Sequence, residues 1–462
     1  MKTLLTRMAI GALSASMLLM MASCGDSSGS TPASHSAGSS KVDNSNAEVF
    51  TIARTSYHED LDPWNMDGEY GEAIRQLFAE IEGEYNIKIK VDYYSPTEFQ
   101  GIAQAAITNG DTAFADIMIM NLFSFGPMYA QGLLMETGEL TGLDITSDVW
   151  SKPIVDLATF KNGNYGLGSA GFSRTEGTAM YYNKTLLNSL GLEDPVQLVR
   201  DGKWTWDKLR ELSLQAAKDL NNDGQFTEAD RFGCTSISYD GLVPMFLTSE
   251  IKAIIKDEDG RLVYNMMADE ASAALQKFKN TFTVNDGMFY GADLDAMTQQ
   301  HQFLSGQCLF MLGSWTDDEE PAEGIEIEAL PLPKYTAESS YLAPCYHNNY
   351  IITVPKTAER KELIGKVLQL IGEKTKDFNT YSIRDASVNY VDRDAYTEMF
   401  EDYVAPGFSA DLFTIMINAG EPIALGTMRA IGMPIITEQP ASDFIQSNAA
   451  AIQSLLDDMF NS

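Results

Sequence analysis

The chain has 462 residues and carries 65 Asp and Glu against 32 Lys and Arg, a formal net charge of −33. Nucleic-acid binding is excluded as its main role, because neutralising phosphates needs clustered basic surface. Four cysteines without a CxxC pair and four histidines without an HExxH motif argue against a disulfide scaffold, a zinc ribbon and a zinc hydrolase. Length and an ordinary hydrophobic content of 44% predict a globular protein of about two or three folding units.

Residues 1–23 predict a cleaved export signal. Lys2 and Arg7 provide a positive start, and the apolar stretch that follows is shorter than the roughly 20 residues of a membrane-spanning helix. The sequence Met-Ala-Ser-Cys that ends at Cys24 resembles a bacterial lipobox, with Met where Leu is usual, so Cys24 is expected to be lipidated. The alternative is an ordinary signal peptide with a coincidental cysteine.

Residues 24–46 are rich in Ser, Gly and Ala and predict a flexible tether, because they cannot bury enough apolar surface to offset chain entropy. No later stretch of 18 apolar residues occurs, so we expect the rest of the chain to be held outside the membrane by its anchor. The remaining cysteines, Cys234, Cys308 and Cys345, are predicted to be small buried hydrophobes.

From Glu48 onward, short apolar runs alternate with amphipathic helices, which predicts an α/β fold with a largely parallel sheet. A strand is expected around 49–53 and a second, alternating strand over 87–93. The helix expected between them has an apolar face made of Ile74, Leu77, Phe78 and Ile81.

A capping box, Ser95-Pro96-Thr97-Glu98, predicts that the next helix starts at Ser95. Its expected buried stripe is Phe99, Ile102, Ala103 and Ala106. Residues 109–111 should end that helix, and the apolar run 116–121 predicts a strand buried on both faces.

Thr205 is the expected N-cap of a later helix. Its predicted buried face comprises Leu209, Leu212, Ala216 and Leu220. Further strands are expected at 308–312 and 350–354, with an amphipathic helix near 362–371.

Five segments, taken in order and spacing, resemble one known family. They are 109–118, 129–134, 181–187 (Tyr-Tyr-Asn-Lys-Thr-Leu-Leu), 204–209 (Trp-Thr-Trp-Asp-Lys-Leu) and 303–315. The family is the family 1 extracellular solute-binding proteins, the substrate-capturing lipoproteins of ABC importers for sugars and related solutes. Phe114-Ala115 departs from the pattern, which often has a proline before the aspartate.

The resemblance implies a periplasmic-binding-protein-like fold of two α/β lobes, with the ligand held in the cleft between them. Because the chain crosses between lobes more than once in this family, lobe one is expected to contain 47–165 and 342–378. Lobe two is then expected to contain 166–341 and 379–462.

Ligands of open α/β sheets sit at the carboxyl ends of strands, and sugars need aromatic platforms beside polar side chains. The residues that follow predicted strands supply both kinds of group, aromatic rings and polar side chains. They are Trp64, Tyr94, Asn121, Phe123, Trp315 and Asn348. Arg174 and Asp317, in loops near cleft strands, are further candidates. The alternative for the aromatic residues is core packing, and for the charged ones a solvated surface.

The segment 219–230 fits the calcium loop D-x-[DN]-x-[DN]-G with an acidic residue at the twelfth position. Its expected ligands are Asp219, Asn221, Asp223, the Gln225 carbonyl and Asp230. Asp230 is shorter than the usual Glu, and the alternative is an Asn-Asp-Gly turn that ends a helix. Bound Ca²⁺ would be structural.

Two other patterns predict little. The segment 166–171 matches G-x-G-x-x-G, but no helix follows and an exported protein meets little NAD, so a flexible connection between lobes is expected. The acidic run 317–320 is expected to be a solvated loop, because adjacent carboxylates rarely face one glycosidic bond.

The sequence therefore predicts a monomeric, lipid-anchored binding protein that captures a carbohydrate, closes around it and delivers it to a permease powered by a cytoplasmic ATPase. We expect no organic cofactor and no enzymatic activity. The alternatives are an exported carbohydrate-active enzyme, a surface glycan-binding protein, or the same fold with another solute.

Overall fold

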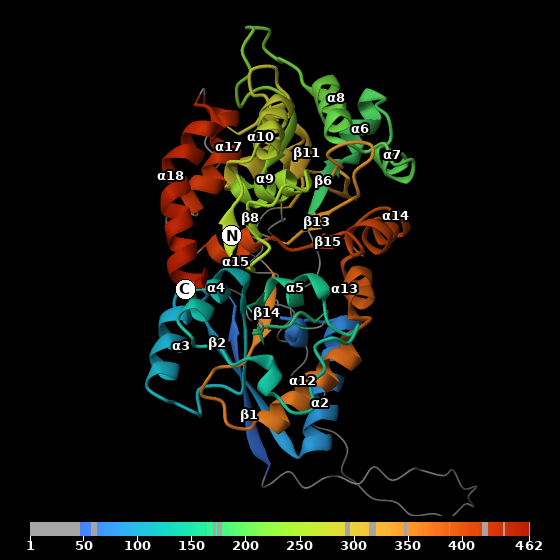
Figure 1. Ribbon diagram of the computed structural model, residues 1–462. Helices are drawn as coiled ribbons and strands as arrows, with labels where there is room; N and C mark the ends of the chain where they lie inside the picture. The colour runs from blue at the N-terminus through green and yellow to red at the C-terminus, as the bar shows by residue number, and fades with distance from the viewer. Residues whose placement is uncertain are drawn as a thin grey trace, which may run out of the picture. The chain divides into compact units, whose positions relative to one another are not determined.

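The computed structural model describes residues 47–56, 62–161, 163–169, 172, 178–291, 296–313, 320–345, 349–387, 389–417, 424–437 and 439–461. By their internal contacts, residues 44–462 form one unit. Its two largest described sheets each have their own helices (Figure 1). We call the part around the four-stranded sheet lobe one and the part around the five-stranded sheet lobe two.

The sheet of lobe one has the strand order β14-β3-β1-β2. Its strands are β1 (Glu48–Thr55), β2 (Ile87–Tyr94), β3 (Ile117–Asn121) and β14 (Tyr350–Thr353). The first three are parallel, and β14 is antiparallel to β3. Helices α2 (Glu69–Tyr85) and α12 (Lys361–Thr375) cover one face, and α3 (Phe99–Thr108) and α4 (Leu122–Ala130) cover the other.

The position of strand β3 between two layers of helices explains why its sequence is continuously apolar. Ile117 and Ile119 join the core beneath α2 and α12, whereas Met118 and Met120 join the core beneath α3 and α4. All five residues of the strand are buried. A strand with helices on both faces has no solvent side, so alternation with polar residues disappears. The predicted strands at 49–53, 87–93 and 116–121 and the helix with Ile74, Leu77 and Ile81 on its buried face are confirmed.

The capping box predicted at Ser95 is wrong. Helix α3 begins at Phe99, and its N-cap Glu98 makes no side-chain cap hydrogen bond. Ser95 instead begins a turn: its carbonyl accepts from the amides of Glu98 and Phe99, and its hydroxyl bonds that of Thr97. The buried residues of α3 are Phe99, Ala103 and Ile107, while Ile102, predicted to be buried, is 41% exposed.

The sheet of lobe two has the order β10-β7-β11-β6-β12. Its strands are β6 (Ala179–Asn183), β7 (Phe232–Ser236), β10 (Phe289–Tyr290), β11 (Cys308–Leu312) and β12 (Ile327–Pro331). Strands β10, β7 and β11 are parallel, but β6 is antiparallel to both of its neighbours. The described sheets are therefore mixed, and the expectation of a largely parallel sheet holds only in part.

The helices around this sheet are α6 (Lys184–Leu190), α7 (Pro195–Arg200), α8 (Trp206–Ala216), α9 (Ser238–Leu247), α10 (Asp269–Thr281) and α11 (Ala296–Leu304). Later in the chain come α13 (Phe378–Ser387), α14 (Arg393–Glu398), η4 (Met399–Val404), α15 (Leu412–Met416), η6 (Ala424–Met428), α17 (Arg429–Ile436), α18 (Ala441–Leu456) and η7 (Asp457–Asn461). The smaller elements are η2 (Pro63–Asn65), η3 (Thr137–Glu139), α5 (Lys152–Leu157), β4 (Thr159–Phe160), β5 (Gly163–Asn164), β8 (Ile254–Lys256), β9 (Leu262–Tyr264), β13 (Ala343–Pro344) and β15 (Phe408–Ser409).

Helix α8 confirms the predicted N-cap, because the Thr205 side chain accepts from the amide of Lys208. Leu209, Leu212 and Ala216 are buried as expected. Leu220 is 48% exposed, since α8 ends at Ala216 and Leu220 lies beyond it, so that part of the predicted face is wrong.

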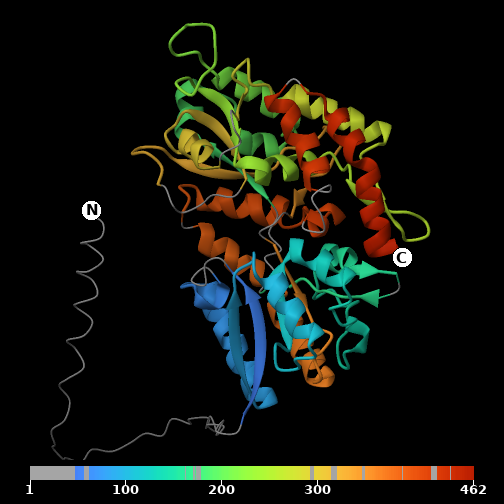
Figure 2. The same ribbon diagram turned by 90° about the vertical axis from the view of Figure 1, so that its left-hand side faces the viewer.

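Segments far apart in the sequence connect the lobes. Strands β13 and β15 pair in parallel, and the amide and hydroxyl of Thr178 both donate to the carbonyl of Pro344. Helix α15 packs on α4, with Gly126 against the Ile415 carbonyl. Phe460 of η7 stacks against Tyr129 and Phe160 of lobe one. The last helix, drawn in red, accordingly ends beside lobe one (Figure 2).

The predicted lobe limits at 165, 341 and 378 stay predictions, because the contacts separate the chain only after Asp43. Helix α13 runs through the expected boundary at 378 and packs on α2, where the Asp385 carboxylate accepts from the amides of Glu69 and Tyr70. The segment 166–168 pairs with β14 through Leu167 and Ile352.

Cys234, Cys308 and Cys345 are free and buried, as predicted, and burial raises the pKa of each thiol. They are therefore inert packing residues at neutral pH. In the described ranges, no helix is long and apolar enough to cross a membrane. The predicted export signal, Cys24 and the whole of the predicted tether lie outside the described residues.

Candidate ligand-binding site

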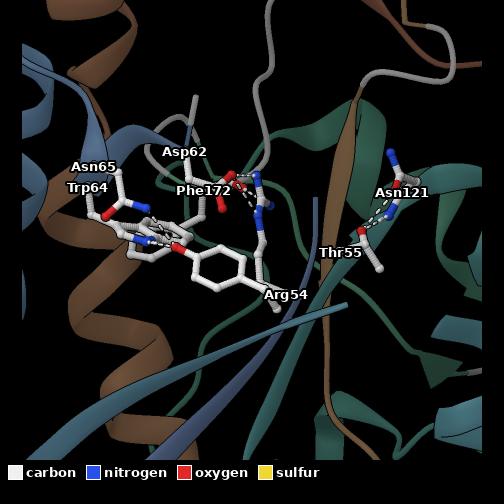
Figure 3. Close-up of polar contacts among 8 residues, drawn as sticks. Arg54, Thr55, Asp62, Trp64, Asn65, Asn121 and Phe172 are labelled. Carbon is white, nitrogen blue, oxygen red and sulfur yellow. Dashed lines mark hydrogen bonds and ion pairs between the residues drawn. The ribbon is translucent and has the colours of Figure 1, made fainter. Parts of the chain in front are cut away.

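Three parallel strands of lobe one end at the same edge of the sheet. Thr55 ends β1 beside Tyr94 of β2, and β3 ends at Asn121 (Figure 3). The Thr55 hydroxyl donates to the Asn121 Oδ1 over 2.7 Å and accepts from the Asn121 amide over 3.1 Å. This reciprocal pair holds both side chains in one orientation at the edge where ligands of α/β sheets bind.

A buried ion pair lies beside this edge. Arg54, 1% exposed, donates from Nε and Nη2 to Oδ1 of Asp62 over 3.1 and 2.8 Å. The same guanidinium donates to the carbonyl of Phe172 over 3.3 Å and lies 3.7 Å from the ring centroid of Tyr350. One cation thus joins the end of β1, the loop before η2, the start of β14 and Phe172, from which the chain continues towards lobe two.

Trp64 is packed into this network rather than standing free. Its indole Nε1 donates to the Tyr93 hydroxyl over 2.7 Å, and its ring lies 5.6 Å from Phe78 and 5.9 Å from Phe172. The residue is 7% exposed and borders a pocket of about 420 Å³ between α2 and β2. A ligand reaching Trp64 would meet little of its surface, and its role as a sugar platform stays a prediction.

The other described candidates in lobe one lie at the same edge. Tyr94 is half-buried, with its ring 5.7 Å from Phe99 and 5.9 Å from Phe114, and burial raises the pKa of its hydroxyl. Phe123 is half-buried in the first turn of α4, two residues after Asn121. The structure therefore places Tyr94 and Asn121 at the same sheet edge, on either side of Thr55, with Phe123 two residues beyond Asn121.

Lobe two offers a corresponding edge where β7 and β11 end in parallel. The amide of Ile237, just after β7, donates to the carbonyl of Leu312, the last residue of β11. Gly241 of α9 packs so closely on this carbonyl that a Cβ there would lie 2.6 Å from it. Gly313 follows with a φ of 111°, a conformation that favours glycine. Trp315 and Asp317 come next in the chain; with Arg174 and Asn348 they lie outside the described residues.

The predicted calcium loop forms a series of turns. Asp219 accepts from the amides of Asn222 and Gly224, and Asp223 accepts from the amide of Gln225. Asp230, fully buried, accepts from the amides of Leu220 and Thr227, and these bonds lower its pKa.

Both oxygens of Asp230 are thus engaged in closing the loop, and the side-chain oxygens of Asp219, Asn221 and Asp223 likewise accept hydrogen bonds within it. Among the described residues, no group of three or more His, Cys, Asp or Glu side chains could hold a metal ion. Calcium binding stays a prediction.

Sequence reasoning missed Arg54, Thr55 and Asp62. A signal was present, because Arg54 interrupts the apolar alternation of β1 one residue before the strand ends. A charged side chain at a core position needs a partner. Only the folded chain shows that the partner is Asp62 and that Tyr350, almost 300 residues later, covers the pair.

Solved structures with this fold include several binding proteins. A cyclo/maltodextrin-binding protein complexed with maltotetraose superposes with a TM-score of 0.60 at 16% identity, covering 88% of this chain and 97% of that one. A cyclic α-maltosyl-1,6-maltose-binding protein from Arthrobacter globiformis gives a TM-score of 0.61 at 12% identity, covering 89% and 100%. UgpB from Mycobacterium tuberculosis, in complex with glycerophosphocholine, gives 0.58 at 14% identity, covering 89% and 99%.

At these identities the likeness establishes the fold, a two-lobe α/β architecture. No curated protein sequence matches the chain. The family model of bacterial extracellular solute-binding proteins matches residues 67–375, more than half of the chain, from the loop before α2 to the end of α12. The chain therefore belongs to the bacterial extracellular solute-binding proteins.

Proposed function

We propose that this protein captures a carbohydrate, most simply an oligosaccharide, for an ABC importer. The observation that carries the proposal is the family match over 67–375, which spans the strands and helices of both lobes. It is supported by the named ligands of structurally similar proteins, among them maltotetraose and a cyclic maltosyl-maltose.

The mechanism is closure of the two lobes around the ligand. Lobe one contributes the edge formed by Thr55, Tyr94 and Asn121, and lobe two contributes the edge where β7 and β11 end. A ligand that contacts both edges only in the closed form shifts the population towards that form by its differential affinity. The closed protein is then the form presented to the permease, and no covalent step takes place in the binding protein.

The export route follows from the same proposal. The family is extracellular, and the predicted signal ends just before Cys24, whose lipidation would hold the mature protein at the outer face of the membrane. We propose that it acts as a monomer beside its permease, with the cytoplasmic ATPase as the energy source.

The test is a thermal-shift screen of residues 47–462 against mono- and oligosaccharides. Amino acids, peptides and polyamines serve as controls, together with glycerophosphocholine, which a structurally similar protein binds. Saturable stabilisation by one sugar class, with no product formed, supports the proposal. A shift only with a non-sugar keeps the importer role and overturns the carbohydrate. Turnover of a glycan would establish the enzyme alternative.

Trp315→Ala sharpens the test, because an aromatic platform in the cleft contributes about 2 kcal/mol or more, close to a 30-fold loss of affinity. Trp315→Phe, which keeps an aromatic face, is the matched control and should lose much less. Equal affinities of both variants and the wild type would remove Trp315 from the site.

A further inference from the structure

A second pocket lies at the connections between the lobes, away from the strand edges described above. It has a volume of about 420 Å³, within the size range of small-molecule sites. One wall is the segment that follows α9, and the others are the segments around β13 and β15. Its apolar lining consists of Leu247, Ile251, Leu342, Pro344 and Ala410.

Asp411 lines this pocket and is 6% exposed. Its Oδ1 accepts from the Phe413 amide over 2.8 Å and so caps the short helix α15. Its Oδ2 is buried and has no hydrogen-bond partner within the described part of the chain. A buried oxygen without a donor is costly, which makes this atom the natural receptor for a donor brought by a ligand.

The surroundings leave the carboxyl poorly compensated. Burial raises the pKa of Asp411 to about 7, while the amides of Phe413 and Ala253 and the Lys252 ammonium act in the opposite direction. The other titratable groups nearby are Glu250, exposed at the rim, and the buried thiol of Cys345. Lys252 also lines the pocket, but its side chain is exposed, so solvent weakens its influence on the buried oxygen.

We propose that this pocket is a second ligand site, separate from the cleft, which takes a small aliphatic amine whose ammonium donates to Oδ2 of Asp411. The five apolar residues provide the surface for the alkyl chain. An ammonium supplies the donor that Oδ2 lacks together with a positive charge in direct contact with it, and such charge-assisted bonds are about twice as strong as neutral ones. The net charge of −33 also raises the local concentration of cations around the protein.

The test is calorimetric titration of the purified protein at pH 7 with n-butylamine, 1-butanol and butyrate, which share a chain and differ in the head group. Butylamine binding should saturate at one site per protein molecule, whereas butanol and butyrate should bind at least tenfold more weakly. Because an ammonium favours the ionised carboxylate, butylamine binding should also release protons. The measured heat should therefore differ between phosphate and HEPES buffers.

Asp411→Asn removes the charge but keeps an oxygen that can cap α15. This variant should bind butylamine at least tenfold more weakly and release no protons on binding. The matched control is Asp194→Asn, because Asp194 caps α7 in the same way through the Val196 amide but is exposed and outside the pocket. Ala410→Leu, which fills the pocket without touching the carboxyl, should also block binding.

Butylamine binding that survives both Asp411→Asn and Ala410→Leu, equal binding of butanol, or no saturable binding would each overturn the proposal. None of these readouts involves a carbohydrate, so failure here is distinguishable from failure of the proposed function.

Discussion

Two buried aspartates in this protein have opposite surroundings. Asp62, 2% exposed, lies beside the strand edge of lobe one and receives two hydrogen bonds from the equally buried Arg54. Asp411, 6% exposed, lies at the connections between the lobes and receives a backbone bond from Phe413 at Oδ1, while its Oδ2 has no hydrogen-bond partner among the described residues. Burial is nearly the same at both sites, and only the partners differ.

The difference shows that burial alone does not decide what a carboxylate does. A carboxylate paired with an arginine fixes the geometry of the segments that carry it, here β1, the loop before η2 and Phe172. A carboxylate without such a partner has a raised pKa and keeps the capacity to bind a donor. The first region is therefore built to hold a shape and the second to respond to its surroundings.

The largest expected effect comes from breaking the paired region. Arg54→Met leaves the Asp62 charge buried without its cation and should lower the free energy of unfolding by about 3–5 kcal/mol. Urea unfolding measures this loss. The control is Arg200→Met, which breaks an exposed pair with Glu398 and should cost at most about 1 kcal/mol. Equal losses in both variants would contradict the assigned role of Arg54.

The second prediction concerns pH and Asp411. An unfolded aspartate ionises near pH 4, whereas the folded carboxyl keeps its proton up to about pH 7. The folded state then binds more protons between these values, so stability falls as pH rises through this window and levels off above it. Asp411→Asn has no carboxyl to titrate and so lacks this loss. As pH rises, its stability relative to the wild type should therefore increase by up to about 4 kcal/mol, since one pKa unit corresponds to about 1.4 kcal/mol.

Urea unfolding of wild type and Asp411→Asn from pH 4 to 8 tests this. Asp194→Asn, an exposed cap of the same kind, should run parallel to the wild type. A constant difference between wild type and Asp411→Asn over the whole range would show that the carboxyl titrates normally.

The third prediction tests the reciprocal bond at the strand edge. Thr55→Val keeps the shape but removes the hydroxyl that bonds Asn121 twice, which should cost about 1–3 kcal/mol of stability. Thr146→Val, which removes an exposed hydroxyl bonded to Asp144, should change stability by less than about 0.5 kcal/mol. If Thr55→Val matches this control, the edge is not held by that bond.

The smallest expected effect is that of calcium at the loop 219–230. At a calcium concentration tenfold above Kd, binding should add about 1.4 kcal/mol of stability, seen as a rise in melting temperature that a chelator reverses. Replacing Asp219 and Asp223 by Asn should abolish the rise. An unchanged melting temperature of the wild type with chelator would leave the loop as a set of turns.

Much of the fold could be predicted because its local patterns are strong. The alternation in β2, the apolar run of β3 and the Thr205 cap each depend on neighbours within a few residues. The errors came where a longer-range demand prevailed. Phe99 must reach the core beside Tyr94 and Phe114, so the chain turns at Ser95 before α3 begins, and Ile102 is left in solvent.

The candidate site was only partly accessible from sequence. Tyr94 and Asn121 could be chosen because they end predicted strands, and parallel strands end at one edge. Trp64 could not be judged in the same way, since Phe78, Tyr93 and Phe172 pack around it only after folding. Likewise, nothing in the neighbourhood of Asp411 in sequence shows that its second oxygen makes no hydrogen bond within the described part of the chain.

By itself, the sequence determined the succession of strands and helices, the family and the positions of strand ends, because these depend on periodicity and on motifs a few residues long. The tertiary structure alone decided which buried charges have partners. Arg54 is joined to Asp62, Phe172 and Tyr350, and the pocket at Asp411 is enclosed by segments from three parts of the chain. Pairing of charges and closure of pockets are set by distances in space, which residues remote in sequence determine together.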